Sequence, residues 1–313
     1  MNFTQRSLEI GPFDIFGLTL HPTIHWYGVI IVTGIIIATS LIAWIAKRDD
    51  EDPDIVWNGV IWVVLLAVIG ARLWSVVFPA GAAGEGRSLS LDYLTDLDNG
   101  PLAIWSGGLS IFGAIVGGLL GIIIYARRQN LQIWKWADRA AIGLPLGQAI
   151  GRWGNYVNQE LYGRPSDLPW AIKIDVPLPE YAGETHFHPL FLYESIGGLL
   201  LCGLLFYLWH NRRQHFQVGD FLLIYGMGYA VIRFLLEFIR VEIPTVSGVN
   251  VSQLTTGIMF VVALWIFLMR HWRGQFVGET YPAFGETSSK KRSNSSKSSK
   301  SSRPKTAKSS KSS

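Results

Sequence analysis

Four charged side chains, Arg72, Arg152, Arg233 and Glu237, lie within or beside stretches of the 313-residue sequence that are otherwise strongly apolar. A charge within a membrane span is costly and usually faces a bundle interior or a water-filled cavity, so each of these residues is a candidate for a functional site. A guanidinium group stays charged and binds phosphate through two parallel hydrogen bonds. Several arginines and a carboxylate beside apolar segments therefore predict a site for the anionic headgroup of an amphiphile, most simply a phospholipid. They do not decide whether chemistry follows binding.

Two segments concentrate this polarity. Residues 147–163, "GQAIGRWGNYVNQELYG", place an arginine, two asparagines and a glutamate directly after an apolar stretch. In "RFLLEFIR", Arg233, Glu237 and Arg240 follow an i, i+4, i+7 spacing, which puts them within about 60° on one helical face. The spacing predicts that Glu237 pairs with an arginine on either side. For Arg240, snorkelling at the membrane edge is the alternative interpretation.

The elements that must position these residues are apolar segments of roughly 20 residues, the length of a membrane-spanning helix. The sequence predicts an all-α integral membrane protein with seven transmembrane helices. The fourth segment has the weakest signal because it is short and is interrupted by Pro145. The seven segments cover residues 24–46, 56–78, 104–126, 137–153, 190–210, 219–240 and 251–270.

Lysine and arginine gather in every second loop, which predicts the orientation because basic residues are retained in the cytoplasm. The loops after the first, third, fifth and seventh segments are the basic ones. We therefore expect the N-terminus outside, the C-terminus in the cytoplasm and the polar cluster on the outer face. The predicted parts are an outer segment 1–23, a transmembrane catalytic domain 24–275 with small outward-facing cap loops at about 79–103 and 154–189, and a cytoplasmic tail 276–313.

The tail differs in composition from the rest of the chain. Residues 288–313 hold 9 Lys or Arg, no acidic residue and 13 serines, whereas the whole chain has a net charge of +4. Such a segment cannot bury a core, so we expect it to be disordered. It either lies on anionic lipid headgroups or serves as a solubilising extension.

Cysteine and metal chemistry are not indicated. Cys202 is the only cysteine, which excludes an intramolecular disulfide, and its apolar surroundings favour a structural thiol over a nucleophile. The sequence has no close histidine and carboxylate pattern such as HExxH. No metal, cofactor or nucleic-acid partner is expected.

The run "GRWGNYVNQELYG" closely resembles the signature of the phosphatidylglycerol:prolipoprotein diacylglyceryl transferases. Further stretches similar to that family follow in its order, over about residues 10–275: "HPTIHWYG", "GARLWSVVF", "WSGGLSIFGA", "HPLFLYE", "RFLLEFIR" and "VSQL". The resemblance implies a bacterial cytoplasmic membrane enzyme that transfers the diacylglyceryl group of phosphatidylglycerol to the lipobox cysteine of a preprolipoprotein. The products are a thioether and glycerol 1-phosphate.

The resemblance also implies residue roles. Arg152 and Arg233 would bind the phosphate and stabilise the leaving group, with Glu160 as the third catalytic residue. Many family members carry a histidine where this sequence has Phe112. The base is therefore Glu160 or His25, or water and the arginines suffice, and Glu160 is favoured. The other expected site residues, in loop-shaping, pocket-lining or supporting roles, are Tyr27, Arg72, Asn155, Asn158, Gly163, His188, Glu237 and Arg240.

Two other functions would also account for some of these residues. An intramembrane serine protease would use Ser110, but it needs a histidine within a later span, and none of the seven histidines lies in the middle of one. A transporter or binding protein for an anionic amphiphile would also explain the arginines. A transporter is expected to show an internal repeat or a polar path across the bilayer, whereas the inner halves of the predicted spans are nearly all apolar.

Overall fold

A computed structural model describes most of the chain between Ser7 and Pro282. The predictions for the loop 79–103 and for "WSGGL" at 105–109 lie outside the described residues. The described residues are 7–9, 13–15, 18–20, 23–78, 110–241, 245–246, 248–272 and 279–282.

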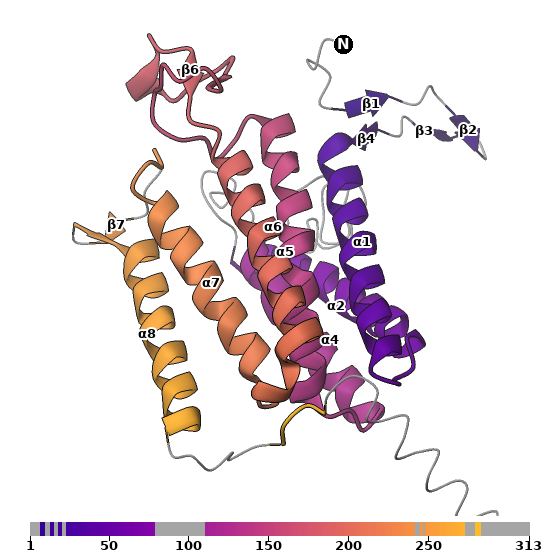
Figure 1. Ribbon diagram of the computed structural model, residues 1–313. Helices are drawn as coiled ribbons and strands as arrows, with labels where there is room; N and C mark the ends of the chain where they lie inside the picture. Colours follow the sequence, from indigo (N-terminus) through magenta and orange to yellow (C-terminus); the bar gives the residue numbers. More distant parts are fainter. Residues whose placement is uncertain are drawn as a thin grey trace, which may run out of the picture.

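The described residues form a bundle of long helices, which confirms the all-α prediction (Figure 1). Each helix overlaps one of the seven predicted segments. Five of them are long and apolar enough to cross a membrane: α1, α2, α4, α6 together with the short turn that follows it, and α8. The helices are α1 (Trp26–Arg48), α2 (Asp54–Val77), α4 (Ile111–Arg128), α5 (Ile133–Asn158), α6 (Leu190–Arg212), α7 (Asp220–Leu236) and α8 (Val251–Trp272).

Helix α5 differs most from its prediction. The sequence suggests a short element, broken at Pro145, but α5 has 26 residues and continues through the proline. Proline removes one helical hydrogen bond, and packing by neighbouring helices makes this tolerable in a bundle. Gly198 of α6 packs so closely here that a Cβ added to it would lie 2.9 Å from the Pro145 carbonyl oxygen. Because α5 packs against α1, α6 and α7, tertiary contacts stabilise a helix whose composition is comparatively polar.

Glycines bring α2 and α4 into close contact. A Cβ added to Gly70 would lie 2.9 Å from the Gly117 Cα. Gly117 belongs to the stretch "FGAIVGG" of α4, and small residues of this kind let helix backbones approach closely in membranes.

The described residues also include four short antiparallel strand pairs outside the helices. Pairing of β5 with β6 places Ile172 opposite Phe187, next to a small core of Tyr162, Ile174 and Phe187. Strand β5 lies within the run "WAIKIDV" at residues 170–176. The other pairs are β1 (Ser7–Glu9) with β4 (Thr23–His25), β2 (Phe13–Ile15) with β3 (Leu18–Leu20), and β7 (Thr245–Val246) with β8 (Val249–Asn250), while β5 is Ile172–Lys173 and β6 is His186–Phe187.

A buried ion-pair network ties three helices together at the end where α1 finishes and α5 begins. Asp49 accepts a bond from Arg139 Nε at 3.0 Å and also pairs with Arg213. Arg139 extends the network to Glu51. The side chains of Asp49, Arg139 and Arg213 are all at most 5% exposed. Removing one of these buried charges would leave its partner uncompensated and would destabilise this end of the bundle.

Residues 279–282, which the sequence places within the tail, pack against this same end. The Tyr281 hydroxyl is buried and donates to Asp138 Oδ2 at 2.7 Å. The Arg213 Nε donates to the Pro282 carbonyl at 2.6 Å, and the Val218 N–H donates to the Glu279 carbonyl. Burial, together with the Asp138 carboxylate, raises the pKa of Tyr281, so its hydroxyl keeps its proton.

Replacing Tyr281 with phenylalanine should destabilise the protein by about 1 to 3 kcal/mol, because a buried hydrogen bond to Asp138 is lost while the ring remains. The midpoint of thermal unfolding in detergent measures the change. The matched control is Tyr207→Phe, since the Tyr207 side chain is 53% exposed on α6. Equal midpoints for the two variants would show that the Tyr281 contact contributes nothing.

Candidate functional site

Three arginines and two glutamates from α5, α6 and the end of α7 form a connected set of ion pairs. Glu194 on α6 pairs through Oε2 with Arg152 Nε and through Oε1 with Arg233 Nη1, the latter at 2.8 Å. Arg233 Nη2 lies 3.1 Å from Glu237 Oε2, and Arg240 Nη1 lies 3.7 Å from the same oxygen. We call these five residues the arginine cluster. With three guanidinium groups and two carboxylates it keeps one net positive charge.

Glu194 is the residue that sequence reasoning missed. It lies in the motif "HPLFLYE", but the sequence alone predicts no role for it. Its carboxylate holds two guanidinium groups side by side, although Arg152 and Arg233 come from different helices. A signal was available, because Glu194 is the only carboxylate within the predicted span 190–210, and an intramembrane charge is a functional candidate.

The predicted pairing of Glu237 with Arg233 and Arg240 is confirmed, but the predicted single helical face is not. Helix α7 ends at Leu236, and Glu237 is its C-terminal cap. Arg240 lies beyond the helix and forms an isolated antiparallel bridge with Gly163. Although Arg240 lies outside the helix, its guanidinium still reaches the fully buried Glu237 side chain.

Amide side chains of residues 147–163 extend the polar contacts of the arginine cluster. Arg152 Nη1 donates to Asn155 Oδ1 at 3.5 Å, and Asn155 Nδ2 donates to Glu160 Oε1 at 2.8 Å. Asn158 Nδ2 lies 3.4 Å from the same Glu160 oxygen. A chain of polar contacts therefore links a cluster arginine to Glu160, which is exposed at the surface of the loop.

Gly163 lies where the loop, the entry to α6 and the end of α7 meet. Its N–H donates to the His188 carbonyl at 2.9 Å. A Cβ added to it would lie 2.7 Å from the His188 Cβ and 2.9 Å from the Ile239 carbonyl oxygen, so only glycine fits. His188 Nδ1 contacts the Tyr193 hydroxyl at 3.2 Å, which is consistent with the structural role expected for it.

The remaining expected residues lie around this cluster. The Tyr27 ring packs on Gly154 of α5, since a Cβ added to that glycine would lie 2.7 Å from Tyr27 Cδ2. His25 is exposed at the start of α1. Arg72 is buried on α2 beside Ala71, whose carbonyl accepts a bond from the Ser110 N–H. The cluster geometry above does not include Arg72 or His25.

Comparison with known proteins identifies the family to which this arrangement belongs. The chain matches the family described as prolipoprotein diacylglyceryl transferase over residues 15–269. The chain belongs to that family. Three similar proteins carry the name phosphatidylglycerol–prolipoprotein diacylglyceryl transferase. They come from Synechococcus elongatus (36% identical, covering 80% of this chain and 81% of the relative), Chloroflexus aggregans (37%, covering 85% and 90%) and Trichormus variabilis (34%, covering 84% and 89%).

Membership in the prolipoprotein diacylglyceryl transferase family confirms the resemblance read from the motifs. Together with the five helices that are apolar and long enough to span, it identifies a multi-pass membrane protein. Phe112, where the resemblance to the family implies a histidine, is 63% exposed on α4 with its ring 6.1 Å from that of Trp74. An apolar ring cannot take a proton, so any base in this family member is another group.

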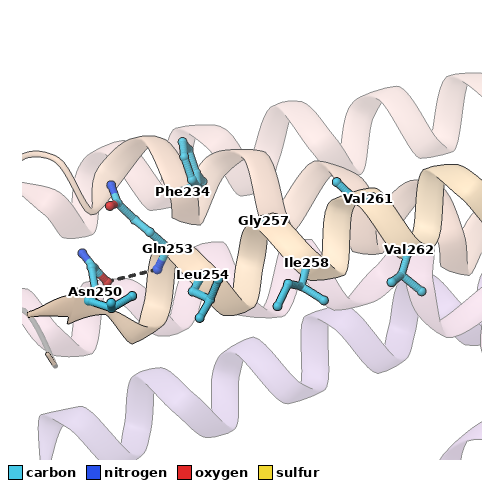
Figure 2. Close-up of a pocket in the computed structure, with 9 residues that line it drawn as sticks. Phe234, Asn250, Gln253, Leu254, Gly257, Ile258, Val261 and Val262 are labelled. Carbon is cyan, nitrogen blue, oxygen red and sulfur yellow. Dashed lines mark hydrogen bonds between the residues drawn. The ribbon is translucent and has the colours of Figure 1, made fainter. Parts of the chain in front are cut away.

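A groove of about 590 Å³ runs between α7 and α8 of this diacylglyceryl transferase family member (Figure 2). Asn250 and Gln253 make one end polar, and the Gln253 N–H donates to Asn250 Oδ1 at 3.0 Å. The wall on α7 is Phe234, which follows Arg233 of the arginine cluster directly in the chain. The rest of the lining is apolar or lacks a side chain: Val249, Leu254, Gly257, Ile258, Val261 and Val262.

Proposed function

We propose that this protein transfers the diacylglyceryl group of phosphatidylglycerol to the lipobox cysteine of preprolipoproteins. The thiolate sulfur attacks the glyceryl carbon that carries the phosphate, and a carbon–sulfur bond forms as the carbon–oxygen bond breaks. The electron pair of the broken bond leaves on glycerol 1-phosphate. The observation that carries the proposal is the pair of guanidinium groups, Arg152 and Arg233, held together by Glu194.

The arginine pair suits a departing phosphate. Each guanidinium has five N–H donors in a planar fork, and the contacts of Arg152 and Arg233 with their carboxylate and amide partners leave further donors for a ligand. The net positive charge of the cluster favours an anion in the resting state. Fixed donors stabilise it more as negative charge accumulates on the leaving oxygen, which is how preorganised sites lower barriers.

We further propose that the arginine cluster faces the outside of the cell and that all seven helices cross the membrane, with residues 154–189 as a cap. Consecutive helices begin alternately at the cluster end and at the opposite end. The basic residues that end α1 and α4, Lys47 and Arg48 and then Arg127 and Arg128, lie at the opposite end. Basic flanks are retained in the cytoplasm, so that end is assigned to the inner face.

Glu160 is the proposed base for the substrate thiol, whose reference pKa is about 8.5. Its carboxylate is oriented by Asn155 and Asn158. Glu160→Gln should lower the transfer rate at neutral pH by about a hundredfold. The deficit should shrink as the pH rises through the thiol pKa, because the thiol then ionises without help. A pH profile of both proteins measures this, and an unchanged rate at neutral pH would leave His25, or water and the arginines, as the means of deprotonation.

The α7–α8 groove is the proposed place for an acyl chain, because it is apolar and begins beside the arginine cluster. Gly257→Phe should fill it, since nothing lies within 4 Å of a Cβ added there. We expect about a tenfold loss of kcat/KM with long-chain phosphatidylglycerol and little change with short chains. Gly203→Phe is the matched control, because Gly203 on α6 also faces open space but lies outside the groove. Equal losses with both lipids would place the acyl chains elsewhere.

The function itself is tested with the purified protein in detergent, phosphatidylglycerol and a lipobox peptide. The expected result is a peptide heavier by one diacylglyceryl group, together with an equal amount of released glycerol phosphate. Binding of lipid and peptide without thioether formation, even in native membranes, would instead indicate a binding protein or transporter for an anionic amphiphile.

A further inference from the structure

A hydrogen-bonded pair of polar side chains lies within the bundle, beyond the arginine cluster. Gln148 Nε2 on α5 donates to the Tyr225 hydroxyl on α7 at 2.8 Å. These are the two helices that carry Arg152 and Arg233. Gln148 precedes Arg152 by four residues, which is about one turn or 6 Å along the helix. Tyr225 precedes Arg233 by eight residues, which is about two turns along α7, so the pair lies between one and two turns from the cluster, toward the apolar interior.

If this pair only joined the two helices, some of its hydrogen-bond donors would have no use. Hydrogen bonds between transmembrane helices contribute modestly to stability, about 0.6 kcal/mol on average. The bond from Gln148 uses one amide N–H and a lone pair of the hydroxyl, so the hydroxyl hydrogen and the second amide N–H remain as donors. Both side chains are only partly buried, which means that the pair borders accessible space within the described part of the bundle.

The transferred lipid carries matching acceptors. The two ester carbonyls of a diacylglyceryl group lie between its phosphate and its acyl chains, and a carbonyl oxygen only accepts hydrogen bonds. With the phosphate at Arg152 and Arg233, the chains must run from the cluster into the apolar region. The glyceryl esters then fall about one helical turn from the arginines, at the depth of Gln148.

Resting on the proposed function, we infer that Gln148 and Tyr225 form a subsite that hydrogen-bonds an ester carbonyl of the diacylglyceryl group. The esters stay intact during transfer, so this subsite binds the part of the lipid that is moved rather than the part that leaves. It makes the protein selective for diester lipids over diether lipids of the same chain length and headgroup.

The test compares diester and diether phosphatidylglycerol with matched chains, using wild type and Tyr225→Phe. The substitution keeps the ring, whose centroid lies 6.2 Å from that of Tyr229, and removes only the hydroxyl. We expect wild type to prefer the diester by about threefold to tenfold in kcat/KM, the effect of one neutral hydrogen bond. Tyr225→Phe should lose that factor with the diester and be unchanged with the diether. Tyr207→Phe, an exposed tyrosine on α6, should retain the preference.

Two outcomes of the rate comparison would overturn the subsite. Equal losses with both lipids would show that the pair only joins α5 to α7, and no loss with either lipid would show that the hydroxyl does not meet the substrate. The same comparison is made by equilibrium binding of the two lipids, without peptide. A wild type that forms no thioether but still binds the diester more tightly, through Tyr225, would contradict the proposed function and retain the subsite. Equal binding of both lipids by wild type would contradict the subsite alone.

Discussion

Replacing Glu194 with glutamine should lower kcat by about a hundredfold, because the carboxylate that aligns two guanidinium groups is lost. Glutamine has nearly the same shape, but it is neutral, and its NH₂ group would face a guanidinium donor. Arg152 and Arg233 would then repel each other and separate, and the phosphate would no longer meet both. Glycerol phosphate release under saturating lipid measures kcat directly.

The matched control for this substitution is Glu184→Gln, which neutralises an exposed glutamate in the segment between β5 and β6. It should leave the rate unchanged. Glu194→Asp adds a second check, since the shorter side chain keeps the charge but cannot reach both arginines in their present positions. A Glu194→Gln rate within twofold of wild type would show that the alignment of the arginines does not matter for transfer.

Arg233→Ala should have a larger effect, about a thousandfold on kcat, the upper range for removing one preorganised donor from a charged transition state. Arg233 contacts both glutamates of the cluster, and the Glu237 side chain is fully buried. Its removal therefore takes away a phosphate ligand and also leaves a buried carboxylate with weaker compensation. Transfer rates and unfolding midpoints are both measured, because the two consequences are different.

A double variant separates these consequences. In Arg233→Ala, the buried Glu237 carboxylate keeps only Arg240 as its partner within the cluster. Adding Glu237→Gln removes this buried charge. We expect the unfolding midpoint to recover while the transfer rate stays low. Recovery of the rate together with the midpoint would assign Arg233 a structural role only. Arg233→Lys should lie between wild type and alanine, because an ammonium keeps the charge but lacks the planar fork.

The helices were predictable to different degrees, for identifiable reasons. Long apolar runs specify α1, α2, α4, α6 and α8, because apolar length is itself the physical requirement for a span. Helix α5 was underestimated, since its stability comes from three packed neighbours that composition does not reveal. The end of α7 was placed too late: the helix ends at Leu236, and Arg240 instead forms a bridge with Gly163, a contact between distant segments that local spacing does not reveal.

The same distinction between local and distant contacts applies to the site. The pairing of Glu237 with Arg233 and Arg240 followed from spacing alone, since all three lie within eight residues. The role of Glu194 did not, because its partners are 39 and 42 residues away and meet it only after α5, α6 and α7 pack. The Gln148 contact with Tyr225 was hidden for the same reason, because the two residues are 77 positions apart in the sequence.

The most direct test of the central proposal is an experimental structure of the protein with phosphatidylglycerol bound, in the absence of peptide. We expect the phosphate to lie within hydrogen-bond distance, about 2.7 to 3.2 Å, of guanidinium nitrogens of both Arg152 and Arg233. Its acyl chains should leave toward the apolar interior. A phosphate that contacts neither arginine, or a lipid headgroup bound at the opposite end near Asp49, would contradict the proposal that these two arginines hold the leaving group.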